Sequence, residues 1–247
     1  MTQVALITGG GNGIGRAVAH RMGAAGIAVI VADYEHGAAE TVSREVKDAG
    51  GKAEALAIDV TVAREVKAVV TDVAQRYGRI DILANIAGGS FYTKRIEEFS
   101  WTEWKQVVDV NLKGTFLMCR EVTPVMKKQK SGRIINTASN YGVTGSALRA
   151  PYAASKAGII AFTKSLALEV AADGILVNTI APGPTDTPRV MGKEAPEARR
   201  ERWWSMIPLG RTAQPDETAE AFYFLASPAS GCITGQTLHV NGALVTP

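Results

Sequence analysis

The sequence has little of the chemistry that builds disulfide frameworks or metal centres. It contains 2 cysteines and 3 histidines among 247 residues. Cys119 and Cys232 lie far apart and form no CxxC motif, and the histidines lack the HxxxH spacing that ligates catalytic zinc. We therefore expect no metal, a reaction that does not use histidine, and a reducing compartment.

The sequence also lacks long apolar runs and segments in which charges of one sign are clustered. No apolar stretch approaches the ~18 residues of a membrane span, and the first residues carry no basic leader. The 27 basic and 24 acidic residues are mixed along the chain and give a formal charge of +3. These absences argue against a membrane and against nucleic acid as partners. We expect a cytoplasmic protein that acts on a small molecule.

What is present is a globular composition with 46% hydrophobic residues and a regular alternation of elements. Short β-branched runs, apolar on both parities, alternate with segments of helical periodicity, which is typical of a parallel sheet covered by helices. The pattern predicts an α/β fold, namely a Rossmann-type doubly wound parallel β-sheet with helices on both faces, as a single domain over 1–247. The expected strands are 4–8, 27–33, 55–60, 80–85, 133–137, 176–180 and 237–240. The expected helices are 14–25, 37–49, 63–77, 101–126, 152–172 and 215–226. A proline-rich excursion at about 184–210 interrupts this rhythm.

A glycine-rich turn joins the first expected strand to the first helix. It reads Thr8-Gly9-Gly10-Gly11-Asn12-Gly13-Ile14-Gly15. Glycines allow the backbone to approach a pyrophosphate, and the helix N-terminus then offers free N–H groups. Such turns also occur for steric reasons alone, so the loop by itself is weak evidence for nucleotide binding. We expect contacts to a dinucleotide from Gly9, Asn12, Gly13, Ile14 and Gly15.

An acidic residue at the end of the second strand strengthens this interpretation. Asp33 follows the loop by about 20 residues, where a carboxylate binds the adenosine ribose diol. The same carboxylate repels a 2′-phosphate, and the next three residues supply no arginine to receive one. The sequence therefore predicts NAD in preference to NADP. In the alternative interpretation, Asp33 only caps the helix that follows.

Three further polar residues form a candidate catalytic set. Tyr152 and Lys156 are four residues apart near the start of a helical pattern, so they share one helix face. Ser139 lies 13 residues before Tyr152, just past an expected strand, at the edge of the sheet where parallel folds bind ligands. A phenol with a pKa of about 10 needs a nearby cation to act as a base, and Lys156 can supply it.

Together these motifs resemble the short-chain dehydrogenase/reductase family, of classical length, over nearly the whole chain. The matching features are the 8–15 loop, Asp59-Val60, Asn85-Ile86-Ala87-Gly88, Asn111, Ser139, Tyr152 with Lys156, Pro182-Gly183 with Thr187, Phe224-Leu225-Ala226-Ser227 and Ile233-Thr234-Gly235-Gln236. The departures are Ile86 in place of a second asparagine, Ala138 where serine is frequent, and Val240-Asn241-Gly242-Ala243 in place of VDGG. None of these removes an expected catalytic group.

The resemblance implies roles for these positions. Tyr152 is the general acid/base, Ser139 hydrogen-bonds the substrate oxygen, and Lys156 binds the nicotinamide ribose and forms a proton relay with Asn111 and water. Further cofactor contacts implied by the resemblance are Asp59, Val60, Asn85, Ala87, Gly88, Pro182, Gly183, Thr185 and Thr187, with Asn85 also tying strands together. The resemblance also implies a homotetramer.

The substrate pocket is expected to be apolar, because aromatic and sulfur-bearing side chains are frequent in the segments that build it. Its expected residues are Ser90, Phe91, Tyr92, Ser139, Tyr141, Leu148, Tyr152, Met191, Trp203 and Trp204. This predicts NAD-dependent interconversion of a hydrophobic secondary alcohol, such as an aryl-alkyl or alicyclic carbinol, and its ketone.

Several alternatives stay open. The arginines of the excursion either are solvated, as charge clusters usually are, or bind an acidic carrier. In the second case the alternative activity is a 3-oxoacyl thioester (acyl-carrier-protein) reductase. These arginines are Arg189, Arg199, Arg200 and Arg202. A dinucleotide-binding sensor or scaffold is the non-enzymatic alternative, and the joint presence of Ser139, Tyr152 and Lys156 argues against it. Trp203 and Trp204 alternatively pack the excursion onto the body of the protein without touching substrate.

Overall fold

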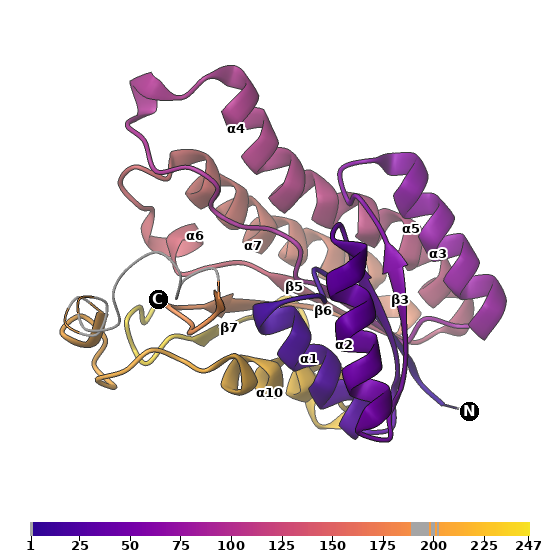
Figure 1. Cartoon of the computed structure of the whole chain (residues 1–247). Coiled ribbons are helices and arrows are strands. Elements are labelled where there is room, and N and C mark those ends of the chain that lie inside the picture. The colour runs from indigo at the N-terminus through magenta and orange to yellow at the C-terminus, as the bar shows by residue number, and fades with distance from the viewer. Residues whose placement is uncertain (1, 189–197, 199–200, 202) are drawn as a thin grey trace.

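A computed structural model describes residues 2–188, 198, 201 and 203–247. In this part of the chain, seven strands form one parallel sheet in the order β3-β2-β1-β4-β5-β6-β7 (Figure 1). The strands are β1 (Val4–Thr8), β2 (Ala28–Asp33), β3 (Lys52–Ala57), β4 (Ile82–Asn85), β5 (Gly132–Thr137), β6 (Ile175–Pro182) and β7 (Thr237–Val240). This confirms the predicted Rossmann-type α/β fold in a single domain.

Helices cover both faces of the sheet (Figure 1). One face carries α1 (Gly13–Ala24), α2 (His36–Asp48) and α10 (Pro215–Ala226). The other carries α3 (Ala63–Tyr77), α5 (Gly114–Gln129) and α7 (Ala150–Val170), with α4 (Trp101–Val108) packed against α7. The short helix α6 (Tyr141–Thr144) joins β5 to α7. No helix in the described residues is long and apolar enough to cross a bilayer.

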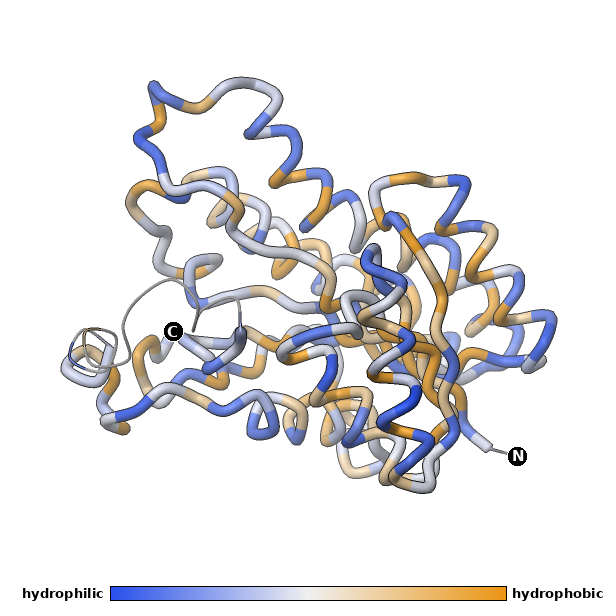
Figure 2. Tube along the Cα trace, in the orientation of Figure 1, coloured by the Kyte–Doolittle hydropathy of each residue, from blue (hydrophilic) through white to orange (hydrophobic). Residues whose placement is uncertain are grey.

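The strands are apolar on both sides because both faces are covered. Along β1, Leu6 packs toward α3, α5 and α7, while its neighbour Ile7 packs toward α1, α2 and α10. Figure 2 shows the result as an apolar band through the middle of the molecule with polar residues on the outer helix faces. This burial accounts for the continuous apolar runs seen in the sequence.

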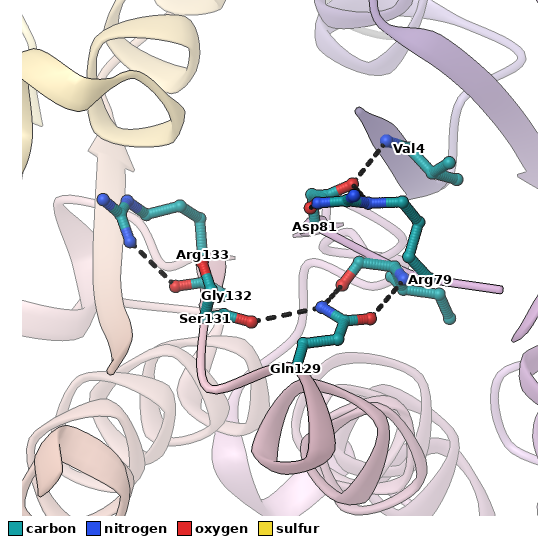
Figure 3. Close-up of polar contacts among 8 residues, drawn as sticks. Val4, Arg79, Asp81, Gln129, Ser131, Gly132 and Arg133 are labelled. Carbon is teal, nitrogen blue, oxygen red and sulfur yellow. Dashed lines mark hydrogen bonds and ion pairs between the residues drawn. The ribbon is translucent and has the colours of Figure 1, made fainter. Parts of the chain in front are cut away.

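The amino ends of the strands are tied together by polar side chains (Figure 3). The buried Asp81 accepts a hydrogen bond from Val4 N at 2.8 Å and forms an ion pair with Arg79. Gln129, at the end of α5, bonds both Ile80 N and Ile80 O at 2.8 and 2.9 Å. These contacts link the strands at their amino ends. The cavity lies at the carboxyl ends of the strands.

Two expected elements differ from those observed. The third strand runs from Lys52 to Ala57 rather than over 55–60, and the apolar residues Ile58 and Val60 follow it in the loop at the sheet edge. The helix expected over 101–126 is divided into α4, a π-helical segment (Asp109–Lys113) and α5. Apolar periodicity does not reveal such an interruption, because a single wider turn hardly disturbs the buried face.

Candidate active site

A cavity of about 1280 Å³ opens at the carboxyl ends of the strands. It spans the point between β1 and β4 where the strand order reverses, the place at which doubly wound sheets bind ligands. We call its two parts the glycine-loop half and the tyrosine half. The glycine-loop half is lined by residues 9 and 12–15, Asp33, Tyr34, Glu35 and Asp59. The tyrosine half is lined by Ser90, Phe91, Ser139, Tyr141, Arg149, Tyr152 and Trp203.

The glycine loop packs too closely against neighbouring backbone to accommodate side chains at Gly9 and Gly15. Gly9 has a φ of +67°, and a Cβ there would lie 2.7 Å from Ala87 N. A Cβ on Gly15 would lie 2.0 Å from Gly9 O. The backbone N–H groups of the loop are therefore not covered by side chains at the start of α1. This arrangement fits the pyrophosphate of a dinucleotide.

Asp33 is fixed beside this loop. Its Oδ2 accepts a hydrogen bond from Gly11 N at 2.9 Å, and its Oδ1 accepts one from Glu35 N at 3.0 Å. The carboxylate therefore steadies the turn into α2 and also lines the cavity. The N-cap of α2 is Glu35, so the alternative in which Asp33 caps this helix is wrong. The placement of Asp33 fits a ribose diol at the end of β2.

Lys156 is buried in the wall of the cavity. It is 3% exposed, and its Nζ donates a hydrogen bond to Thr137 O at 2.7 Å. Helix α7 places it one turn after Tyr152, with Nζ 5.6 Å from the centroid of the tyrosine ring. Burial lowers the pKa of the Lys156 ammonium to about 7, since the charged form loses hydration. A polar ligand placed at this ammonium would favour its charged form.

Ser139 reaches the same wall from the end of β5. It is buried, lines the cavity and accepts a hydrogen bond from Tyr141 N at its Oγ, at 3.3 Å. The Tyr141 ring meets the Tyr152 ring edge to face, with centroids 6.5 Å apart. Helix α6 packs closely on α7, because a Cβ on Gly142 would lie 2.7 Å from the backbone carbon of Lys156. The serine and tyrosine therefore face one space.

Asn111 lies behind the cavity wall, in the π-helical segment. Its side chain donates to Gly89 O and to Val107 O, and its Oδ1 accepts from Gly89 N at 3.1 Å. A Cβ on Gly88 would fall 2.4 Å from Asn111 Oδ1 and 3.5 Å from Lys156 Nζ. Asn111 is thus adjacent to the lysine but does not itself line the cavity.

Most of the predicted cofactor residues line the cavity. These are Gly9, Asn12, Gly13, Ile14, Gly15, Asp33, Asp59, Val60, Ala87, Gly88, Tyr152, Lys156, Pro182, Gly183, Thr185 and Thr187. Asn85 does not, because its amide is turned into the protein and donates to Asn136 Oδ1 at 2.8 Å and to Cys119 Sγ. It ties β4 to β5, as the sequence also suggested.

The predicted substrate residues divide into two groups. Ser90, Phe91, Ser139, Tyr141, Tyr152 and Trp203 line the cavity. Tyr92, Leu148 and Trp204 do not, because the Tyr92 hydroxyl donates to Gln106 Oε1 and the other two side chains are 46% and 42% exposed. Met191 and the arginines at 189, 199, 200 and 202 lie outside the described residues.

Some lining residues were missed by the sequence analysis. Thr102, Lys105, Gln106 and Asp109 reach the cavity from α4 and the segment after it, and Leu244 reaches it from the C-terminal region. Only the tertiary fold brings these segments together. Arg149 was also missed, although it lies only three residues before Tyr152 in the sequence. No group of three His, Cys, Asp or Glu side chains in the described ranges could hold a metal ion.

Known proteins resemble this chain over almost its full length. A family model described as "Enoyl-(Acyl carrier protein) reductase" matches residues 9–244. The chain is 40% identical to "3-oxoacyl-[acyl-carrier-protein] reductase FabG" of Thermotoga maritima over 98% of both chains, and 40% identical to the Staphylococcus aureus protein of the same name over 99% and 98%. The structure of an actinorhodin polyketide ketoreductase variant with NADPH is similar at a TM-score of 0.94, with 36% identity over 98% and 97% of the two chains. Levodione reductase is similar at 0.93, with 32% identity over 97% and 96%.

Proposed function

The chain belongs to the short-chain dehydrogenase/reductase family, and we propose that it reduces 3-oxoacyl thioesters to 3-hydroxyacyl thioesters with NADH. It is an oxidoreductase of a carbonyl or alcohol group that uses a nicotinamide dinucleotide. The observation that carries the proposal is the meeting of Ser139, Tyr152 and Lys156 in one cavity with the glycine loop. The thioester is supported by the names of relatives that match the chain from end to end.

The side chains of the tyrosine half have complementary tasks. Tyr152 donates its hydroxyl proton to the substrate oxygen, and Ser139 donates a hydrogen bond to the same oxygen as negative charge develops there. The bound nicotinamide dinucleotide supplies the hydride. Lys156 stabilises the phenolate that Tyr152 leaves, because its ammonium is adjacent to the tyrosine and poorly hydrated. Asn111 holds the backbone of Gly89 and so fixes the loop after β4 next to Lys156.

The preference for NADH over NADPH is proposed from Asp33. Its carboxylate lines the cavity at the end of β2, where it accepts hydrogen bonds from a ribose diol and repels a 2′-phosphate. Glu35 lines the same half and adds negative charge. A relative with NADPH bound has the same fold, so this preference is a property of the local residues and requires its own test.

A hydrophobic secondary alcohol, such as an aryl-alkyl or alicyclic carbinol, is the second candidate substrate. It is favoured by Phe91, Tyr141 and Trp203, which give the tyrosine half three aromatic walls. Levodione reductase is the solved neighbour whose name fits this class of substrate.

The deciding experiment measures NADH consumption with acetoacetyl thioesters, alicyclic ketones and aryl-alkyl ketones at equal concentrations, and repeats the series with NADPH. The proposal expects the highest kcat/KM for the thioesters and with NADH. Turnover concentrated on the alicyclic or aryl ketones would replace the proposed function by the second candidate. A higher kcat/KM with NADPH would refute the assignment of Asp33.

We also propose a homotetramer. Exposed apolar side chains on two neighbouring helices support it, since Phe116 of α5 is 43% exposed and Leu168 of α7 is 85% exposed. Phe224 of α10 and Leu238 of β7 form a second exposed apolar pair. Light scattering at micromolar concentration should give four times the chain mass, and a monomer would contradict the assignment.

A further inference from the structure

We propose that Arg149 binds an anionic group of the substrate in the tyrosine half of the cavity, and that it thereby selects among substrates. The inference rests on the proposed function and deepens it, because it names a recognition group in the tyrosine half. The chemical class bound is an anionic oxygen group, a carboxylate or a phosphate, which the planar guanidinium pairs with through two parallel hydrogen bonds.

Charge in the cavity singles out this arginine. Three cationic side chains line the described part of the cavity, namely Lys105, Arg149 and Lys156. Lys105 forms an ion pair with Asp109, and Lys156 is buried beside Tyr152. Arg149 has no carboxylate partner among the described residues, whereas Arg16, Arg76 and Arg211 elsewhere in the chain are all paired. Its charge is available to a ligand.

The position of Arg149 is close to the proposed chemistry. It is the N-cap residue of α7 and lies three residues before Tyr152, which is in the first turn of that helix. Its guanidinium carbon is 5.8 Å from the centroid of the Tyr141 ring, which in turn meets the Tyr152 ring. Stacking on Tyr141 steadies the guanidinium but leaves its N–H edge free to bind an anion.

The loop that presents Arg149 is held in an unusual backbone conformation. Leu148 has a φ of +64°, which non-glycine residues rarely adopt. Its carbonyl oxygen accepts a hydrogen bond from Lys94 N at 2.9 Å, which ties the loop before α7 to the loop after β4. Strain of this kind persists only where the surroundings enforce it, and here it sets the position of the following residue, Arg149.

The other half of the cavity has the opposite charge. Asp33, Glu35 and Asp59 line the glycine-loop half. An anionic substrate is therefore repelled from that half and attracted toward Arg149, which orients it with its carbonyl toward Tyr152. The anion has two chemical sources, the carboxylate of a free 3-oxo acid or the phosphate of a phosphopantetheine thioester.

The test compares three substrates that share the acetoacetyl group. Acetoacetate carries a carboxylate, acetoacetyl-coenzyme A carries phosphates, and the acetoacetyl thioester of N-acetylcysteamine is neutral. Each is reduced by the wild type, by Arg149→Gln and by the conservative Arg149→Lys, with Arg44→Gln on the exposed face of α2 as the matched control. Calorimetric titration of the enzyme–NAD⁺ complex with acetoacetate, a pair that cannot transfer a hydride, measures binding without turnover.

The expected result is a change in selectivity. In Arg149→Gln, kcat/KM for an anionic substrate relative to the neutral thioester falls about 10-fold to 100-fold, mainly through KM, and Arg149→Lys restores part of it. A loss confined to acetoacetate identifies a carboxylate, and a loss confined to the coenzyme A thioester identifies a phosphate. Equal changes for all three substrates would overturn the proposal, as would a loss of acetoacetate turnover in Arg149→Gln that leaves the acetoacetate affinity intact.

The two proposals fail in different ways. If the wild type reduces acetoacetate but neither thioester, the proposed function is wrong and the role of Arg149 is still decided by the acetoacetate data. If it reduces the thioesters and the Arg149 variants retain the wild-type selectivity, the role of Arg149 is wrong and the proposed function stands.

Discussion

The two halves of the cavity differ in how their walls are built. The glycine-loop half is made mostly of one continuous turn and the residues that follow β2 and β3, all within the first quarter of the chain. The tyrosine half joins segments near residues 90, 105, 140, 150, 203 and 244. The first half is shaped by backbone geometry and fits a group common to many enzymes, whereas the second is formed by side chains from scattered loops, where specificity varies.

The halves also differ in charge. Three acidic side chains line the glycine-loop half, while Lys156 and Arg149 give the tyrosine half an excess of positive charge beyond the Lys105 and Asp109 pair. Under the proposed function, the acidic half holds the ribose diol and the positive half holds the anionic group of the substrate. Variants in each half should therefore affect different kinetic parameters, and the following experiments test that separation.

The largest effect is expected for Tyr152→Phe, in the tyrosine half. Removing the hydroxyl removes the proposed proton donor, so kcat should fall about 10²-fold to 10⁴-fold while the affinity for NADH stays near that of the wild type. Tyr92→Phe is the matched control, because the Tyr92 hydroxyl bonds Gln106 and does not line the cavity. Substantial turnover by a folded Tyr152→Phe variant would contradict the assignment.

The next effect is expected in the glycine-loop half, for Asp33→Ala. Loss of the carboxylate removes a charge-assisted hydrogen bond to the ribose diol and the repulsion of a 2′-phosphate. The ratio of kcat/KM with NADH to that with NADPH should fall about 10-fold to 100-fold. Glu35→Gln, in the same half, should change the ratio less, since Asp33 alone bonds the glycine loop. An unchanged ratio in Asp33→Ala would count against the cofactor assignment.

A third effect concerns stability in the absence of cofactor. Because burial lowers the pKa of Lys156 from 10.5 to about 7, the unfolded chain binds a proton that the folded chain has lost between these pH values. The free energy of unfolding should therefore rise with pH in this window, by at most about 1.4 kcal/mol per pH unit from this group, and the contribution should be flat below pH 7.

Lys156→Met should remove this dependence and raise the melting temperature near pH 7, measured by thermal denaturation at several pH values. Lys164→Met, at an exposed position of the same helix, is the control and should keep the wild-type slope. If Lys156→Met and the wild type show the same pH dependence, the buried ammonium does not have a lowered pKa.

The smallest effect is expected for the two adjacent tryptophans. Trp203 lines the cavity, whereas Trp204 does not and is 42% exposed. Trp203→Ala should raise KM for a long-chain or aromatic substrate by about threefold to tenfold through lost apolar contact, with kcat less affected. Trp204→Ala should change KM less than twofold by the same reasoning. Equal effects would mean that the pair acts through packing alone.

The predictability of the site follows the same division. The glycine loop, Asp33 and the Tyr152–Lys156 pair were predicted because local geometry dictates them, through a turn that excludes side chains and a helix that places residues four apart on one face. Tyr92, Leu148 and Trp204 were expected in the pocket, and their neighbours in the chain do line it. Adjacent side chains of a loop point in different directions, so one can face the cavity while its neighbour does not. The hydrophobic periodicity of the sequence does not show which of the two faces the cavity.

By itself the sequence determined the fold class, the order of strands and helices along the chain and the glycine loop, because these depend on hydrophobic period and short spacings. The proposed catalytic set rests on the spacing of Tyr152 and Lys156 and on the resemblance to the family. The tertiary structure alone decided that Arg149 lies over the Tyr141 ring, that Asn111 lies behind the cavity wall in a π-helical turn and that Leu244 reaches the cavity. These features arise where loops distant in the chain pack against one another, and their contacts depend on the whole fold rather than on any one segment.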